Sequence, residues 1–378
     1  MKSMNCLEYF SYSLLFLCNK YIGISCTENT LHWFENKMIC KYVPRKELLP
    51  MDIPTIEADQ LTGKLFYELS NNFRNPVLIK GFLKDTKAVN EWDIDYLEKI
   101  VGDFNVNILR IKETQNIKVE SIAFNEFTKE MKTENVYLNN NSTIFQNFPI
   151  LFNDIQEKFY KFINLVHSNL RNIYISNLFI GYNEKDNVVG SNMHAGGVGN
   201  FFCMIHGKKH WTLINPQYSC LLKGRVSEKA THAQTLFDMP DTKLSIIPKM
   251  LKHFPRYDIT LEPGDILWNA PWWWHRIENS EGLSIGIAIR NNKVTTLNLL
   301  NNITYTLSGT TYLVYNTFIL SLYEKFIRKD KHFFVSDDNK KSNVLYQIEK
   351  LIEKYPKTIT YDEVITKSTS INMNLKDK

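Results

Sequence analysis

Two histidine-bearing stretches, far apart in the chain, constrain the fold more than any other feature. The first runs from Ser191 to Trp211 and contains His194, and the second runs from Glu262 to Ile277 and contains His275. Each combines a hydrophobic, β-prone run with a turn, glycine-rich in the first and Pro-Gly-Asp in the second. A small barrel can bring both imidazoles to one point, where they can bind a transition metal. Either histidine alone is more typical of a hydrogen-bonded structural residue, so only the pair indicates a metal site.

The bulk composition excludes several other classes of protein. The chain has 378 residues, of which 44% are hydrophobic and 13% aromatic, and this is typical of a globular protein with one large domain or two small ones. A net charge of +5 is modest, and no phosphate loop or basic cluster with interleaved aromatics occurs, so there is no specific nucleic-acid signal. The six cysteines lack the spacing of a disulfide framework, which leaves the compartment open.

The first 25 residues allow two interpretations. The apolar run from Tyr9 to Cys18, followed by small residues from Gly23 to Ser25, has features of a signal peptide and would place the protein in the secretory pathway. Glu8 lies in the early region and the apolar run is barely long enough for a signal. We therefore favour an amphipathic surface helix and a cytoplasmic protein.

Residues 51 to 173 predict mixed helices and strands ahead of a barrel. The apolar run from Asn75 to Phe82 suits a buried strand, and Trp92, Tyr96 and Ile100 have helical spacing before Gly102. The other expected elements are a helix at 65–73, strands at 106–111, 118–123 and 173–182, a short helix at 124–131 and a loop at 139–142.

The histidine stretches resemble those of the cupin-like JmjC group of iron(II)- and 2-oxoglutarate-dependent oxygenases, which includes the asparaginyl hydroxylase of the hypoxia pathway. The shared pattern is a first histidine, an Asn-Phe-Phe strand, a strand lysine after glycine, and a distal histidine after Pro-Gly-Asp and an aromatic-rich strand. It covers about Ile53 to Arg290. The resemblance implies a mainly β domain with flanking helices (α+β) around a double-stranded β-helix, or jelly-roll, core. It divides the chain into an N-terminal segment 1–50, a cupin-like domain 51–292 with a barrel core at about 173–292, and a C-terminal helical region 293–378.

The resemblance also implies roles for individual residues. His194 and His275 would bind Fe(II), and Lys209 would hold the distal carboxylate of 2-oxoglutarate. Lys209 alternates with Trp211 and Leu213, which favours an inward-facing side chain over a solvated turn. The remaining cosubstrate candidates are Asn200, Ser191 and Arg290.

One position departs from the family pattern, because Gly196 stands where the relatives have the iron-binding carboxylate. In a continuous strand His194, Gly196, Val198 and Asn200 would share one face. Three interpretations stay open: a working oxygenase whose third ligand is water or another side chain, a halogenase in which chloride takes the vacant ligand position, and a binding protein without turnover.

Several other residues bear on the pocket. We expect at least one indole of the Trp272-Trp273-Trp274 run to line the opening, with Trp272 and Trp273 as the candidates. Gly286 and Ala288 in the last strand would leave room for a ligand. His206 and His210 are expected at the surface, and His232 and His253 lie in an insertion, 217–257, that would overhang the barrel mouth.

The C-terminal region has no charged residue from Val294 to Tyr323. Its mostly apolar part, from Tyr312 to Tyr323, is shorter than the roughly 20 residues that cross a bilayer, so we expect packed helices. The resemblance implies that these helices serve for packing or for a homodimer. The substrate, a small molecule or a protein side chain, is not encoded in any readable motif.

Overall fold

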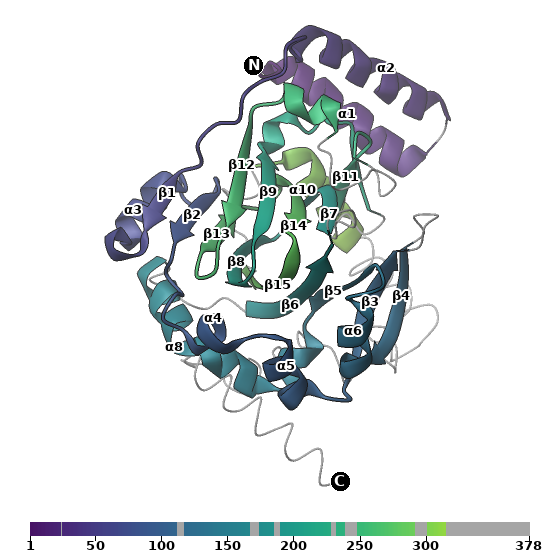
Figure 1. Cartoon of the computed structure of the whole chain (residues 1–378). Helices are drawn as coiled ribbons and strands as arrows, with labels where there is room; N and C mark the ends of the chain where they lie inside the picture. Colours follow the sequence, from purple (N-terminus) through teal and green to yellow (C-terminus); the bar gives the residue numbers. More distant parts are fainter. Residues whose placement is uncertain are drawn as a thin grey trace, which may run out of the picture. The chain divides into compact units, whose positions relative to one another are not determined.

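The computed structural model describes residues 1–23, 25–111, 117–166, 174–184, 190–227, 232–238, 248–291 and 301–314. Contacts within the chain define two units, Met1–Thr310 and Thr311–Lys378. The fold described below is that of the first unit (Figure 1). Of the predicted C-terminal helical region, only α10 (Ile303–Val314) falls within the described residues.

Two sheets form the centre of the first unit. Within the described residues, one sheet has nine strands in the order β1-β2-β13-β8-β15-β6-β5-β3-β4 and the other has six in the order β10-β11-β7-β14-β9-β12. Neighbouring strands are antiparallel except β1 and β2. The nine-stranded sheet consists of β1 (Thr55–Glu57), β2 (Val77–Lys80), β13 (Ile266–Asn269), β8 (Gly199–His206), β15 (Gly282–Asn291), β6 (Tyr174–Asn183), β5 (Val136–Asn141), β3 (Asn105–Ile111) and β4 (Ile117–Ala123). The six-stranded sheet consists of β10 (Gly224–Val226), β11 (His232–Thr235), β7 (Gly190–Gly196), β14 (Trp274–Asn279), β9 (Lys209–Ile214) and β12 (Arg256–Leu261).

The chain path between the sheets is that of a jelly roll. From β6 to β9, and again from β12 to β15, successive strands alternate between the two sheets. This alternation winds the backbone into a double-stranded β-helix, and it confirms the predicted mainly β fold with flanking helices.

The helices cover the outer faces of the two sheets. In Figure 1, α1 and α2 lie beside the six-stranded sheet, and α4, α5 and α8 lie below the nine-stranded one. The helix bounds are α1 (Cys6–Ile22), α2 (Ser25–Tyr42), α3 (Gly63–Leu69), α4 (Lys87–Glu91), α5 (Ile94–Val101), α6 (Phe124–Glu130), α7 (Thr143–Asn147) and α8 (Pro149–Val166), with short 3-10 turns at Ala58–Gln60, Pro216–Tyr218 and Lys249–His253. None of the described helices is both long and apolar enough to cross a bilayer.

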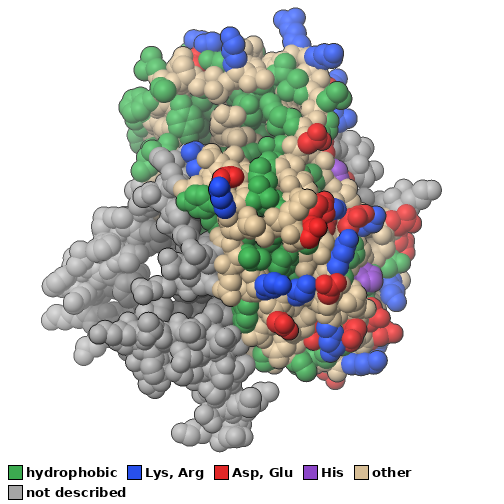
Figure 2. All heavy atoms as spheres, turned by 90° about the vertical axis from the view of Figure 1, so that its left-hand side faces the viewer, with side chains coloured by type: hydrophobic (Ala, Val, Ile, Leu, Met, Phe, Trp, Pro, Cys, Tyr) green, Lys and Arg blue, Asp and Glu red, His purple; other side chains and the backbone are tan. Residues whose placement is uncertain are grey.

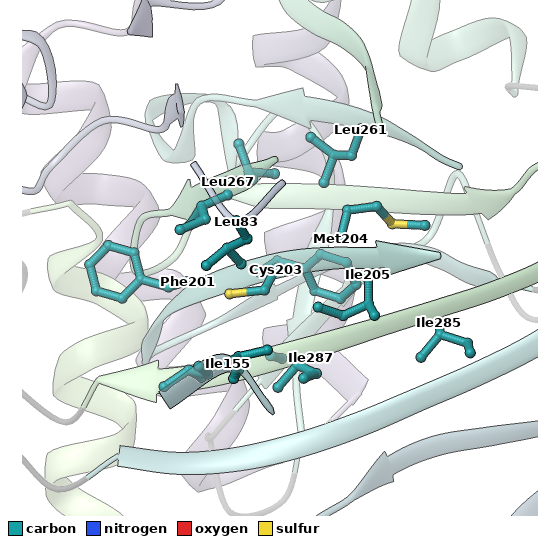
Figure 3. Packing of buried hydrophobic residues seen from close by; sticks show 14 of the residues in the cluster. Leu83, Ile155, Phe201, Cys203, Met204, Ile205, Leu261, Leu267, Ile285 and Ile287 are labelled. Atoms are coloured by element: carbon teal, nitrogen blue, oxygen red, sulfur yellow. The ribbon is translucent and has the colours of Figure 1, made fainter. Parts of the chain in front are cut away.

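Two hydrophobic cores follow from this layering. The larger fills the space between the two sheets and the space between the nine-stranded sheet and α8. Figure 3 shows part of it, with Ile155 of α8 and Ile287 of β15 among its members. The smaller joins α1, α2 and α10 to the outer face of the six-stranded sheet. Tyr12 and Phe16 of α1 are buried there. The apolar run that resembles a signal peptide is thus packed in this structure as a helix.

The N-terminal helices also expose apolar side chains. Leu7, Phe10 and Leu14 of α1 are 74%, 66% and 53% exposed. Figure 2 shows hydrophobic side chains gathered on the upper part of one face of the molecule.

Some local expectations need correction. Residues 139–141 belong to β5 rather than to a loop. The strand is irregular there, because its register with β6 shifts between Leu138 and Asn141 and Asn140 has a left-handed φ of 56°, which asparagine tolerates. Trp92 ends α4, and Asp93 caps the separate helix α5. The expected helix at 65–73 stops at Leu69, since Asn71, Asn72 and Phe73 all have positive φ.

A candidate metal centre between the sheets

The structure brings His194 and His275 together. They lie directly opposite each other on β7 and β14, and their ring centroids are 4.1 Å apart with the planes tilted by 53°. Trp211 of β9 stacks on His275, with ring centroids 5.6 Å apart, and restricts the orientation of the imidazole. Two strands therefore present two imidazoles to one point.

The hydrogen bonds of both imidazoles leave Nε2 available. Nδ1 of His194 lies 2.7 Å from the carbonyl oxygen of Asn192, and Nδ1 of His275 lies 2.9 Å from that of Trp273. A carbonyl oxygen only accepts, so each Nδ1 carries the proton and each Nε2 keeps its lone pair. A hydrogen bond from the second ring nitrogen to a carbonyl is the usual way of orienting a metal-binding histidine.

Burial also keeps both rings neutral. It lowers the pKa of His194, and it lowers the pKa of His275 well below its usual value, with a further contribution from His194. A neutral imidazole is the form that coordinates a metal ion. At neutral pH the pair is therefore ready to bind one.

A bulge in β7 sets which residues share the face of His194. The register shifts so that His275 lies opposite His194 but Ile277 lies opposite Ser191, three residues earlier. Residues that are directly opposite in a sheet point to the same side. Ser191 thus joins the histidines on the inner face, although simple alternation from His194 would direct it outward.

Asp238 holds this bulge in place. Its carboxylate accepts hydrogen bonds from the backbone N–H of Met193 at 2.7 Å and from the amide of Asn192 at 2.9 Å. It also pairs with Nε of Arg276 at 3.0 Å, and both side chains are almost completely buried. Sequence reasoning misses this role, because Asp238 lies in the irregular insertion and has no motif spacing to either histidine.

Gly196 ends β7 beside the two rings. A Cβ built on Gly196 would meet no atom within 4 Å, whereas one on Gly197 would lie 2.9 Å from the ring of Trp272. The position of the missing carboxylate is therefore open space. The expectation that Val198 and Asn200 continue the same strand face is wrong, because the chain turns at Gly197 and Val198 and enters β8 of the other sheet.

Asn200 nevertheless faces the interior, from the opposite wall. Asn269, Asn200 and Arg290 lie directly opposite one another on β13, β8 and β15, so they form one polar row. The row begins next to the candidate metal ligands, since the amide of Asn269 lies 3.3 Å from Nδ1 of His275. The side-chain oxygens of Asn200 and Asn269 are buried without a hydrogen-bond partner among the described residues. Arg290 ends the row and donates to Oδ1 of Asn140 at 2.5 Å.

Lys209 is the second cation of the interior. It is completely buried, donates to Oδ1 of Asn279 and to Oγ of Ser284 at 3.1 Å, and lies over the ring of Tyr137. Burial lowers the pKa of Lys209 to about 7. No carboxylate pairs with it in the part of the chain that the structure describes.

The position of Lys209 relative to the histidines suits a bridging ligand. Leu213 lies opposite His275, and Lys209 is four residues earlier on the same strand, which corresponds to about 13 Å of β-strand. A buried ammonium needs a compensating anion. A dicarboxylate that reaches from Lys209 toward the histidines would supply it.

The three consecutive indoles do not line an opening. Trp272, Trp273 and Trp274 are at most 5% exposed, and each N–H donates to a protein acceptor. They can all be buried because Trp272 has a φ of 64° and only Trp274 belongs to β14, so the three side chains do not share one strand face. None of them is exposed at an opening, contrary to the expectation for at least one, and the assignment of Trp272 and Trp273 to a substrate pocket stays a prediction.

The remaining expectations concern Gly286 and the histidines outside the candidate centre. A Cβ on Gly286 would lie 2.4 Å from the ring of Phe202, which fills the space beside this glycine, so packing rather than ligand room explains it. His206 and His210 are half-buried at the ends of their strands. His253 contacts the carbonyl oxygen of Pro44, away from the centre.

Comparison with known proteins agrees with this geometry. A family model described as "Cupin-like domain" matches residues 65–290, more than half of the chain. The chain belongs to the cupin-like family. JmjC domain-containing protein A of Dictyostelium discoideum is 24% identical over 241 residues, 59% of this chain and 90% of that protein. JmjC domain-containing protein E of the same organism is 26% identical over 197 residues, 45% of this chain and 54% of that protein. The mouse tRNA wybutosine-synthesizing protein 5 is 24% identical over 252 residues, 57% of this chain and 70% of that protein.

The donor set of this cupin-like domain fits a family-type iron(II) centre in part. Two neutral imidazoles converge with free Nε2 atoms, as such a centre requires. The carboxylate of the usual two-histidine, one-carboxylate site is absent, and within the described residues no group of three His, Cys, Asp or Glu side chains is preformed. The buried, unpaired charge of Lys209 fits a carboxylate cosubstrate.

Proposed function

We propose that this cupin-like protein is an iron(II)- and 2-oxoglutarate-dependent oxidoreductase that hydroxylates or halogenates an unactivated C–H bond. The observation that carries the proposal is the convergence of His194 and His275 with both Nε2 atoms free, facing the same interior as a buried lysine that pairs with no carboxylate of the described residues. Iron(II) with 2-oxoglutarate, when bound, supplies the oxidising power that attacks such a bond. Its substrate would be a small molecule or a protein side chain.

Each of the inward-facing polar residues would have a distinct role in binding the metal ion or the cosubstrate. His194 and His275 would hold the metal ion, while Lys209 and Ser284 would fix the distal carboxylate of the cosubstrate. Asn200, Asn269 and Arg290 would receive the polar atoms nearer the metal, because their row begins at His275. Ser191 shares the inner face of β7 and would add a hydroxyl there. The buried indole of Trp211, which stacks on His275, would help to exclude water.

The group that occupies the open space at Gly196 would decide between two reactions. A water molecule or a protein side chain in the third ligand position would support hydroxylation, and a chloride ion there would support halogenation. Arg290 contributes to the lowered pKa of both histidines after their burial, and its positive charge favours an anion near them.

A second function has an observation in its favour. The described residues contain no preformed three-ligand group, which is what a cupin-like binding protein without turnover would show. The same buried Lys209 would then serve to bind an anionic ligand.

Two measurements separate these functions. Calorimetric titration with iron(II) and 2-oxoglutarate, with and without chloride, measures binding, and an assay of succinate measures turnover. Succinate formation without a need for halide would indicate a hydroxylase, and dependence on halide a halogenase. Anion binding with neither turnover nor iron binding would indicate a binding protein. If His275→Ala left iron affinity unchanged, the metal site proposed above would be wrong.

A further inference from the structure

The position opposite Gly196 on the neighbouring strand is occupied by a histidine. His232 of β11 lies directly across from Gly196 of β7, and Gln234 lies directly across from His194. Residues that face each other in this way have Cβ atoms about 4.5–5.5 Å apart and point to the same side of the sheet. His232 therefore projects from the face that carries both candidate metal ligands.

The burial pattern of β11 supports this orientation. Ala233 and Thr235 are buried, and Ala233 belongs to the core beneath α1 and α2, whereas His232 and Gln234 are exposed. Alternate residues of a strand point to opposite faces. The His232 side chain is thus directed away from the outer helices and toward the side of His194.

The strand order places the three histidines around one point. β11, β7 and β14 are consecutive neighbours in the six-stranded sheet, as Figure 1 shows, with His194 and Gly196 on the middle strand. His275 approaches from one neighbour and His232 from the other. Burial is the main cause of the lowered pKa of His194, and an electrostatic interaction with His232 lowers it further.

Space exists for the His232 ring to reach the metal position. A Cβ at Gly196 would meet nothing within 4 Å, so the volume that a carboxylate would fill is free. His232 itself lines a hollow of about 180 Å³, together with Arg225, Val226, Ser227, Gln234 and Leu236. His232 is exposed, so a change of its rotamer would not displace core residues.

We propose that His232 supplies the third protein ligand, turning toward Gly196 on metal binding to complete a three-histidine centre in place of the missing carboxylate. This inference rests on the metal site of the proposed function. Imidazole suits iron, zinc and related divalent ions, so the exchange keeps a ligand of an accepted type while removing one negative charge. It also closes the third position to halide and so favours hydroxylation over halogenation.

The test measures Co(II) affinity by calorimetry in the full-length protein, because Co(II) binds imidazole and does not oxidise readily. His232→Ala should weaken Co(II) binding at least about tenfold, a loss that is typical even for groups that only support a ligand. Gln234→Ala, on the same face of β11, and His206→Ala, which removes a histidine elsewhere, should leave the affinity unchanged. Adding Gly196→Asp to His232→Ala should restore binding, since it returns a carboxylate to the free space.

Pulsed EPR of the Cu(II)-loaded protein supplies a second readout, by counting coordinated imidazoles. The wild type should show three and His232→Gln two. Equal affinity and equal imidazole counts in wild type and the His232 variants would overturn the inference, and so would tighter Co(II) binding by the wild type when chloride is added. If His194→Ala and His275→Ala also left the affinity unchanged, the proposed function would fall as well, so the two failures are distinguishable.

Discussion

Replacing Lys209 is the most direct test of the charges in the interior, because a buried ammonium without a paired anion makes the free energy of unfolding depend on pH. Its pKa is about 7 in the folded protein and about 10.4 in an unfolded chain. The unfolded state therefore binds more protons between these values, and stability rises with pH across that window. Replacing Lys209 by methionine, which has a similar length and no charge, should remove this dependence.

The magnitude follows from the two pKa values. At about pH 7 the difference of roughly three units costs the wild type on the order of 4 kcal/mol, and at about pH 9.5 the remaining cost is on the order of 1 kcal/mol. Methionine would leave Oδ1 of Asn279 and Oγ of Ser284 without their donor, at about 1–3 kcal/mol each. These losses do not depend on pH in this range. The stability of Lys209→Met relative to wild type should therefore fall by about 3 kcal/mol from about pH 7 to about pH 9.5.

Urea unfolding of both proteins, followed by circular dichroism at several pH values in this window, measures the difference. Other groups titrate equally in the two proteins and cancel. Lys208→Met is the matched control, since Lys208 is the neighbouring lysine, is 54% exposed and pairs with Glu262 at the surface. A stability difference for Lys209→Met that does not change with pH, or changes as little as that of Lys208→Met, would refute the assignment of Lys209 as a buried, unpaired cation.

Four further predictions follow from the same site. Gly196→Asp should fold normally and tighten Co(II) binding by at least about tenfold in the His232→Ala background, as measured by calorimetry. The affinity for 2-oxoglutarate should fall by up to about tenfold per pH unit above about pH 7, because binding its carboxylate requires protonated Lys209; a flat profile from calorimetry would contradict this. Asp238→Asn should cost about 3–5 kcal/mol of stability in urea, because it removes the buried charge that pairs with Arg276, whereas exposed Asp85→Asn should cost less than about 1 kcal/mol. Co(II) and 2-oxoglutarate should each raise the affinity of the other by the same factor, about 5–150-fold, and Lys209→Met should reduce that factor; independent binding would show that the two groups do not share one interior.

The sequence allows the fold to be predicted further than the site. Hydrophobic runs with period-2 alternation locate β6, β8, β9 and β15, because one or both faces of each strand must be buried. The same rule places Lys209 inside correctly, since its neighbours Trp211 and Leu213 are core residues. It fails at Val198 and Asn200, where the chain leaves one sheet for the other and the alternation restarts.

What could not be predicted depends on contacts between distant segments. Register shifts such as the one between His275 and Ile277 have no local sequence signal, and only this bulge directs Ser191 inward. Asp238, which holds the bulge, is recognisable only once Met193 and Arg276 are seen beside it. A regular strand over residues 272–274 would leave at least one indole exposed, whereas all three are buried here and Trp272 has a left-handed φ of 64°.

The charges of the interior are compatible with a working metal centre even though Gly196 provides no carboxylate. Two neutral imidazoles, Lys209 and Arg290 surround the space between the sheets, and no carboxylate of the described residues pairs with Lys209. A divalent metal adds two positive charges to this set, so binding it alone is opposed by like charge. A dicarboxylate cosubstrate offsets that charge and fits the lysine at its far end. In the proposed centre, loss of the protein carboxylate would shift the anionic ligands from the chain to the cosubstrate, and the imidazole of His232 would fill the remaining position as an uncharged ligand.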